Sequence, residues 1–208
     1  MARLSRRTFI KSSAVASAAF SFAISGTRSS GQIIGANETI NIGVAGIHGR
    51  GSNHIDAFCA MPNVRVTYLI DPDSRLFAGR IKQVETRGKN TPKCVQDVRE
   101  ALDDKDLHAI SIATCNHWHS LMTIWACQAG KDVYVEKPCS HNVFEGRKCV
   151  EAARKYGRIV QHGTQSRSSA SWARQVAAIA SGKYGRLLVS KGYSSKPRWT
   201  IGFKPVKD

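Results

Sequence analysis

Apolar residues along this chain form short unbroken runs that alternate with longer stretches in which they recur at helical spacing. The short runs predict buried strands over residues 40–45, 64–70, 107–114, 132–135 and 158–161. Helical spacing follows Gly51 and recurs over residues 74–87, 95–102, 117–128 and 143–155. Repeated strand–helix units indicate a parallel sheet with right-handed crossovers. We therefore expect an α/β fold with a doubly wound parallel sheet.

The pattern changes near residue 165, which predicts a domain boundary there. A helical stretch at residues 168–181 precedes an apolar run at residues 186–193 that has no crossover helix after it. We interpret this run as the first strand of a second sheet. Residues 38–165 are then expected to form one Rossmann-like doubly wound domain, and residues 166–208 are expected to begin a second, α+β domain.

The first predicted strand ends in a glycine-rich turn that precedes a helical pattern. Strand, glycine turn and helix are the context of a dinucleotide fingerprint, because helix-start N–H groups and the helix dipole bind a pyrophosphate. Counted as G-x-G-x-x-G from Gly46, the turn has His48 in place of the middle glycine and ends at Gly51. An ordinary strand-to-helix turn is the alternative. We expect cofactor contacts from Gly46, His48, Gly49, Arg50 and Gly51.

The second predicted strand ends at Asp71, which lies near the spacing of roughly 20 residues expected for a ribose-binding acid. A carboxylate there accepts hydrogen bonds from both ribose hydroxyls and repels a 2′-phosphate. Asp71 therefore favours NAD over NADP. Arg75 follows closely and could pair with a phosphate, which keeps NADP open.

The first 25 residues predict a targeting segment that is separate from the fold. Arg6 and Arg7, followed by Phe9 and Lys11, resemble the twin-arginine export motif. The apolar stretch that follows is too short and too polar to span a bilayer, and residues 26–37 read as a linker rich in Gly, Ser and Asn. We expect no stable membrane span and a periplasmic or secreted location.

Charge and cysteine usage narrow the candidate functions. The 208 residues carry a formal net charge of +16, but no Lys/Arg run exceeds two residues and no basic helix is interleaved with aromatics. We interpret this charge as a basic surface that attracts anionic substrates, and we expect no nucleic-acid partner. Six cysteines without a C-x-x-C pair are spread like core thiols and do not suggest a disulfide framework.

Polar segments follow several of the predicted strands, and these segments resemble those of a known family. The segments are Gly46–Gly51, Thr114-Cys-Asn-His-Trp-His119, Glu136-Lys-Pro138, Gly163–Arg167 and Lys196–Gly202. Together they resemble the N-terminal half of the glucose–fructose oxidoreductase, inositol dehydrogenase and rhizopine-catabolism family (Gfo/Idh/MocA). The resemblance covers residues 38–203, and Glu-Lys-Pro is its most discriminating part. It implies that residues 38–165 are a Rossmann-like NAD(P)-binding domain and that residues 166–208 are the start of a truncated α+β substrate domain.

The resemblance implies hydride transfer between the nicotinamide and a carbinol or ketone carbon of a sugar or polyol. Lys137 would be the catalytic residue that hydrogen-bonds the reacting hydroxyl. The further cofactor-binding residues it implies are Thr114, Asn116, His119, Glu136 and Gln165. Cys115 departs from the family's usual proline, and the family's acid-and-histidine motif would lie beyond residue 208. The chain is therefore expected to be inactive alone, and a homo-oligomer is left open for a full-length form.

Three other functions compete with this dehydrogenase. A glycosidase of the same superfamily would use bound NAD for transient oxidation. A non-catalytic nucleotide-binding module would lack turnover. A metal site would use His117, His119, Cys139 and His141, but two histidines separated by one residue point to different sides of a helix start. We therefore expect no metal.

Replacing Arg6 and Arg7 together by Lys is expected to leave the precursor in the cytoplasm, because the pair carries the twin-arginine signal. Cell fractionation followed by immunoblotting measures the distribution. Normal yield of the double variant in the periplasm would contradict the assignment.

Overall fold

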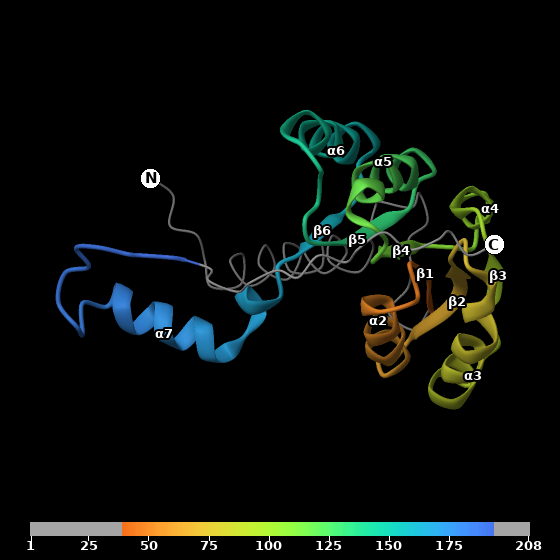
Figure 1. Ribbon diagram of the computed structural model, residues 1–208, viewed down its shortest axis with the longest axis horizontal. Helices are drawn as coiled ribbons and strands as arrows, with labels where there is room; N and C mark the ends of the chain where they lie inside the picture. Colours follow the sequence, from red (N-terminus) through yellow and green to blue (C-terminus); the bar gives the residue numbers. More distant parts are fainter. Residues whose placement is uncertain (1–38, 194–208) are drawn as a thin grey trace, which may run out of the picture. The chain divides into compact units, whose positions relative to one another are not determined.

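The structure is a computed structural model that describes residues 39–193 (Figure 1). The chain divides into two compact units with a boundary between Thr164 and Gln165. The first unit contains a six-stranded sheet of order β3-β2-β1-β4-β5-β6, in which every neighbouring pair is parallel. The strands are β1 (Ile40–Ala45), β2 (Val64–Ile70), β3 (Lys93–Val95), β4 (Ala109–Ile112), β5 (Asp132–Glu136) and β6 (Val160–Gly163).

Helices cover both faces of this sheet, as Figure 1 shows. The α-helices are α2 (Arg50–Cys59), α3 (Phe77–Gly88), α4 (Val98–Leu102), α5 (His119–Gln128) and α6 (Val143–Tyr156). Short 3-10 helices, η2 (Ser74–Leu76) and η3 (Asn116–Trp118), precede α3 and α5. One buried cluster joins the sheet to α2 and α3, and the other joins it to α4, α5 and α6. Burial on both faces explains why the strands read as continuous apolar runs.

The doubly wound α/β fold expected from the sequence is confirmed, with one correction in the first unit. The helix predicted over residues 95–102 is wrong at its start, because Lys93–Val95 form the edge strand β3 and the helix begins at Val98. Asp97 ends the extended segment, and its side chain accepts a hydrogen bond from the Arg99 N–H as an N-cap. A three-residue strand is too short to show a periodicity of its own.

The second unit begins with η4 (Gln165–Ser168) and α7 (Ala170–Ala180), which match the predicted helix there. The strand predicted over residues 186–193 is wrong, because these residues adopt no regular structure. A strand is stabilised by pairing, and no partner strand for this run exists among residues 39–193. The twin-arginine segment and Lys196–Gly202 lie outside the described residues, so export stays a prediction.

None of the helices within residues 39–193 is long and apolar enough to cross a membrane.

The strand order reverses between β1 and β4, which lie side by side at the centre of the sheet. From β1 the chain proceeds outward through β2 to β3, and from β4 it proceeds the other way through β5 to β6. The loops that leave the carboxyl ends of β1 and β4 diverge at this point. In open parallel sheets such a point forms a crevice in which ligands bind.

Two glycines allow α2 to begin directly against the end of β1. Gly46 has φ +80°, and a Cβ there would lie 2.6 Å from the backbone of Ala113 and Thr114. A Cβ on Gly51 would lie 1.9 Å from the carbonyl oxygen of Gly46. These are the turn and packing roles of the first and third glycines in a dinucleotide fingerprint. Gly49 has no atom within 4 Å of such a Cβ.

Gly51→Ala is expected to destabilise the fold, since its methyl group would meet backbone that cannot rotate away. Overpacking of this kind costs about 1–3 kcal/mol or more, and each kcal/mol lowers Tm by roughly 2–4 °C in a chain of this size. Gly49→Ala is the matched control, with an expected cost within about 1 kcal/mol. Thermal unfolding followed by circular dichroism measures both. Equal melting temperatures for the two variants would contradict this account of the turn.

Candidate active site

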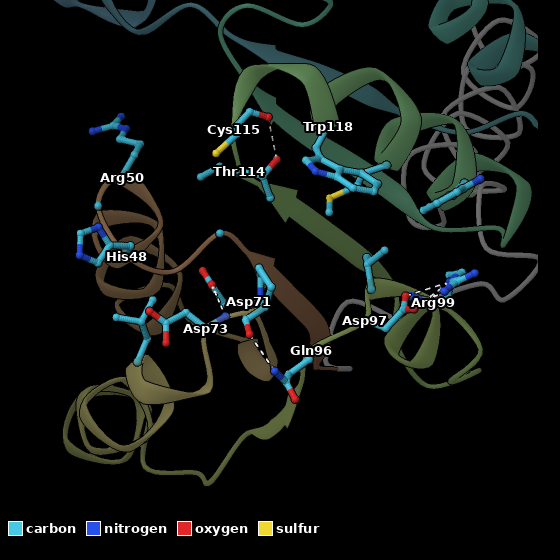
Figure 2. Close-up of a pocket in the computed structure, with 18 residues that line it drawn as sticks. His48, Arg50, Asp71, Asp73, Gln96, Asp97, Arg99, Thr114, Cys115 and Trp118 are labelled. Atoms are coloured by element: carbon cyan, nitrogen blue, oxygen red, sulfur yellow. Dashed lines mark hydrogen bonds and ion pairs between the residues drawn. The ribbon is translucent and has the colours of Figure 1, made fainter. Parts of the chain in front are cut away.

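A cavity of about 930 Å³ opens at the carboxyl ends of β1, β2, β3 and β4. Six of the residues predicted from the sequence to bind a cofactor line it: Gly46, His48, Gly49, Arg50, Asp71 and Thr114. Figure 2 shows Asp71 and Asp73 on one side of this space and Thr114 and Trp118 on the other. The cavity therefore lies at the point of strand reversal and has a volume typical of small-molecule sites.

The glycine turn is held by side chains from the neighbouring β2–α3 segment. The Ile47 N–H donates to Asp71 Oδ2 at 3.0 Å. Arg80, on α3, donates from Nε to the Ile47 carbonyl at 2.8 Å and from Nη2 to the His48 carbonyl at 2.7 Å. No side chain caps the start of α2. The Ser52 N–H donates to the Gly49 carbonyl at 3.1 Å, and no side-chain oxygen occupies the helix start, where Gly49 and Arg50 line the cavity. A helix start of this kind suits an anion.

Asp71 is nearly buried, at 8% exposure, directly after β2. Its Oδ1 accepts from the Asp73 N–H at 3.0 Å, while Oδ2 accepts from Ile47. A carboxylate offers about four lone-pair sites, so these two bonds leave acceptor capacity on the cavity side. Asp71 thus fixes the glycine turn and can also accept hydrogen bonds from a ligand.

Two further carboxylates at the cavity are each paired with an arginine. Arg75 donates to both oxygens of Asp73, at 2.7 and 2.9 Å, and these hydrogen bonds lower the pKa of Asp73. Arg99 pairs with Asp97 in the same way and lowers the pKa of Asp97 to about 2. Both carboxylates are therefore ionised and paired at neutral pH, whereas Asp71 accepts from backbone N–H groups.

An aromatic wall that the sequence did not predict faces these carboxylates. Trp118, Met122 and Trp125 line the cavity from η3 and α5, and the two indole rings lie 6.2 Å apart. The Arg99 guanidinium lies 5.9 Å from the centre of the Trp125 ring. The three side chains are spaced four and three residues apart, which places them on one helix face. This spacing is the feature of the sequence from which the aromatic wall could have been predicted. The wall offers a flat apolar surface.

Behind the turn, a chain of buried polar side chains runs from β4 to the cavity mouth. Ser111 Oγ lies 2.8 Å from His54 Nδ1, and His54 Nε2 lies 3.0 Å from Glu136 Oε1. The same Glu136 oxygen accepts from Arg50 Nε at 3.0 Å. Burial lowers the pKa of His54. Burial alone would raise the pKa of Glu136, but hydrogen bonds from Arg50 and His54 outweigh it and keep that pKa below its ordinary value.

Several predicted site residues lie elsewhere. Glu136 is 4% exposed and sits behind Arg50, outside the cavity lining. His119 is 1% exposed, and its ring nitrogens lie 2.6 Å from the Pro138 carbonyl and 3.1 Å from the Thr114 carbonyl. His119 therefore joins the loops that follow β4 and β5. Both side chains support the site from behind, although the sequence predicted that they bind the cofactor.

Gly51, which the sequence also predicted to contact the cofactor, is buried against the Gly46 carbonyl and lies outside the cavity lining. The other predicted residues are exposed or belong to the second unit. Asn116 is exposed in η3, outside the cavity lining. Lys137 is exposed directly after β5, and its bond to Pro138 is cis. Gln165 begins the second unit and has φ 49°. Within residues 39–193, no group of three His, Cys, Asp or Glu side chains could hold a metal ion.

Comparison with known proteins places this geometry among nicotinamide-dependent enzymes. Residues 40–164 match the family model described as "Oxidoreductase family, NAD-binding Rossmann fold" (GFO_IDH_MocA). A glycosyl hydrolase family 109 protein of Shewanella pealeana is 25% identical over 82% of this chain and 39% of its own length. The scyllo-inositol 2-dehydrogenase (NAD(+)) of Bacillus subtilis is 29% identical over 65% of this chain and 38% of its own length.

Solved structures show the same fold. The scyllo-inositol dehydrogenase of Lactobacillus casei, with bound NAD(H) and scyllo-inositol, superposes with a TM-score of 0.63 at 19% identity. The match covers 71% of this chain and 43% of that one. The chain thus spans well under half the length of these relatives.

Proposed function

The chain belongs to the oxidoreductase family with an NAD-binding Rossmann fold, matched over residues 40–164, and we propose that its cavity binds NAD for hydride transfer on a sugar or polyol. One observation carries the proposal. The turn after β1, the acid after β2 and the loop after β4 meet around one cavity at the strand reversal. When bound, NAD supplies the hydride acceptor.

The lining fits the parts of a dinucleotide. The uncapped start of α2 suits the pyrophosphate, because Gly46 and Gly51 let backbone N–H groups approach it. Asp71 has acceptor sites for the ribose hydroxyls beside that turn. The wall of Trp118 and Trp125 suits the adenine ring, which stacks on flat apolar surfaces. These features support a dinucleotide over a single phosphate.

The charges near Asp71 support NAD over NADP. A 2′-phosphate would lie against the Asp71 carboxylate, which has no arginine or lysine partner within the described residues and accepts only from backbone N–H groups. Arg75, the residue that kept NADP open in the sequence, donates two hydrogen bonds to Asp73. Recruiting Arg75 to a phosphate would break that bidentate pair. We therefore assign NAD as the preferred cofactor.

Lys137 is the residue that we assign to proton handling. It is exposed at the carboxyl end of β5, next to a Glu136 that is fixed in the protein interior. An ammonium group there can donate to the oxygen of a substrate carbinol or ketone and stabilise its alkoxide character. The inositol dehydrogenases among the relatives support a polyhydroxylated substrate.

The glycosyl hydrolase family 109 relative supports a second candidate, a glycosidase that uses a retained NAD for transient oxidation. The two candidates differ in their products. A dehydrogenase accumulates NADH from a free sugar, whereas this glycosidase releases an aglycone with no net change in NADH. Absorbance at the NADH band, measured alongside aglycone release, separates them.

Asp71→Ser is expected to weaken NAD binding at least tenfold and to narrow the preference over NADP, because a hydrogen bond to a charged group contributes about 1.5–3 kcal/mol. Calorimetric titration of the chain with both cofactors measures this. Asp103→Ser is the control, since Asp103 is exposed at the far end of α4. A general loosening of the turn would weaken both cofactors equally. Tighter binding of NADP by the unaltered chain would contradict the assignment.

Lys137→Ala is expected to leave NAD affinity unchanged, because Lys137 lies outside the cavity lining. Turnover, measured with the chain continued through the substrate domain that the family resemblance implies, should fall by about 10²–10⁴-fold. Lys105→Ala is the control, because Lys105 is exposed in the loop before β4. Unchanged turnover of Lys137→Ala would identify Lys137 as an ordinary surface lysine.

A further inference from the structure

His54 is a buried polar residue that belongs to none of the sequence motifs. It lies on the inner face of α2, 6% exposed, with its ring edge-on to Tyr134 and Phe58. Ser111, Tyr134 and Glu136 alternate with the apolar residues of β4 and β5 and face this side of the sheet. His54 is therefore the side chain through which α2 contacts the polar positions of both strands.

The contacts of His54 determine which nitrogen carries its proton. Burial lowers the pKa of His54, so the ring is neutral near pH 7 and has a single N–H. Glu136, whose pKa lies below its ordinary value, is an ionised acceptor 3.0 Å from Nε2. The proton therefore sits on Nε2 and is donated to Glu136, while Nδ1 accepts from the Ser111 hydroxyl at 2.8 Å.

Glu136, held in place by His54, in turn restricts the position of the Arg50 side chain. Its Oε1 accepts from Arg50 Nε, and the Arg50 side chain is 47% exposed and lines the cavity. In a half-exposed ion pair with a mobile carboxylate, both side chains must be ordered to make the contact, so the pair fixes the position of the arginine only weakly. Here the carboxylate is buried and receives a second donor from the helix that carries Arg50. The guanidinium has two further nitrogens, Nη1 and Nη2, that can donate to an anion.

We propose that His54 is a positioning residue for cofactor binding: it holds Glu136 so that Glu136 orients the Arg50 guanidinium toward a cofactor phosphate at the glycine turn. This inference rests on the proposed function, because it takes NAD as the ligand of the cavity. It assigns Glu136 a role behind the cofactor site, through Arg50. It also gives α2 two roles: its first turn contacts the phosphate, and His54 in its second turn positions Arg50 through Glu136.

Two substitutions at His54 separate this role from packing. The amide nitrogen of Gln reaches the place of Nε2, so His54→Gln retains the donor to Glu136. The shorter Asn ends near the place of Nδ1, so His54→Asn keeps only the contact with Ser111. Calorimetric titration of the 208-residue chain with NAD is expected to show about tenfold weaker binding for His54→Asn. His54→Gln should stay within about threefold of the unaltered chain.

A double-mutant cycle with Arg50→Met tests whether the effect passes through Arg50. In the Arg50→Met background, which lacks the guanidinium, adding His54→Asn should weaken NAD binding by less than about twofold relative to Arg50→Met alone. A loss of equal size in both backgrounds would show that His54 only supports the fold, and would overturn the proposal. If His54→Asn folds too poorly to titrate, His54→Gln and Glu136→Gln decide. The proposal then requires near-normal affinity in the first and a clear loss in the second, smaller than that of Arg50→Met, because the neutral amide holds the Arg50 guanidinium less firmly.

The outcomes also separate this inference from the proposed function. Failure of the unaltered chain to bind NAD would contradict the proposed function itself. NAD binding by the unaltered chain together with unchanged affinity in His54→Asn would contradict only the role of His54.

Discussion

The site depends on the direct backbone contact between the first turn of α2 and the end of β1. Gly51 lies so close to the Gly46 carbonyl that no side chain fits between them. This contact fixes where α2 begins, beside the cavity that Gly49 and Arg50 line. It also brings Arg50 and His54, one helical turn apart, to the carboxyl ends of β1, β4 and β5. A helix displaced by one methyl group would disturb both arrangements.

Two kinds of polar side chain form the site: those that line the cavity and those that support the lining from behind. The lining includes exposed or half-buried groups such as Arg50 and Thr114, together with the buried carboxylate of Asp71, and these groups have capacity for a ligand. The supporting groups are buried and bind other protein groups, as His54, Glu136 and His119 do. Because buried polar groups require partners, each supporting contact restricts the conformations of the residue in front of it.

The sequence predicted what local periodicity and spacing determine. The long strands and helices, the doubly wound sheet and the glycine-rich turn between β1 and α2 follow from signals within a few residues of each other. It did not predict β3, which is three residues long, or the pairing of His54 with Glu136, which lie far apart in the chain. The apolar run at residues 186–193 has the pattern of a strand, but a local pattern does not show whether a neighbouring strand is present to pair with it. Contacts made by the fold are visible only in the structure.

The aromatic wall has a consequence for how the cavity can be observed. Trp118 and Trp125 both line it, whereas Trp172 lies on α7 in the second unit. An occupant that approaches these two indole rings changes the polarity around them and quenches or shifts their emission. The protein therefore contains a built-in optical reporter of ligand occupancy, which responds before any chemistry takes place and without an added label.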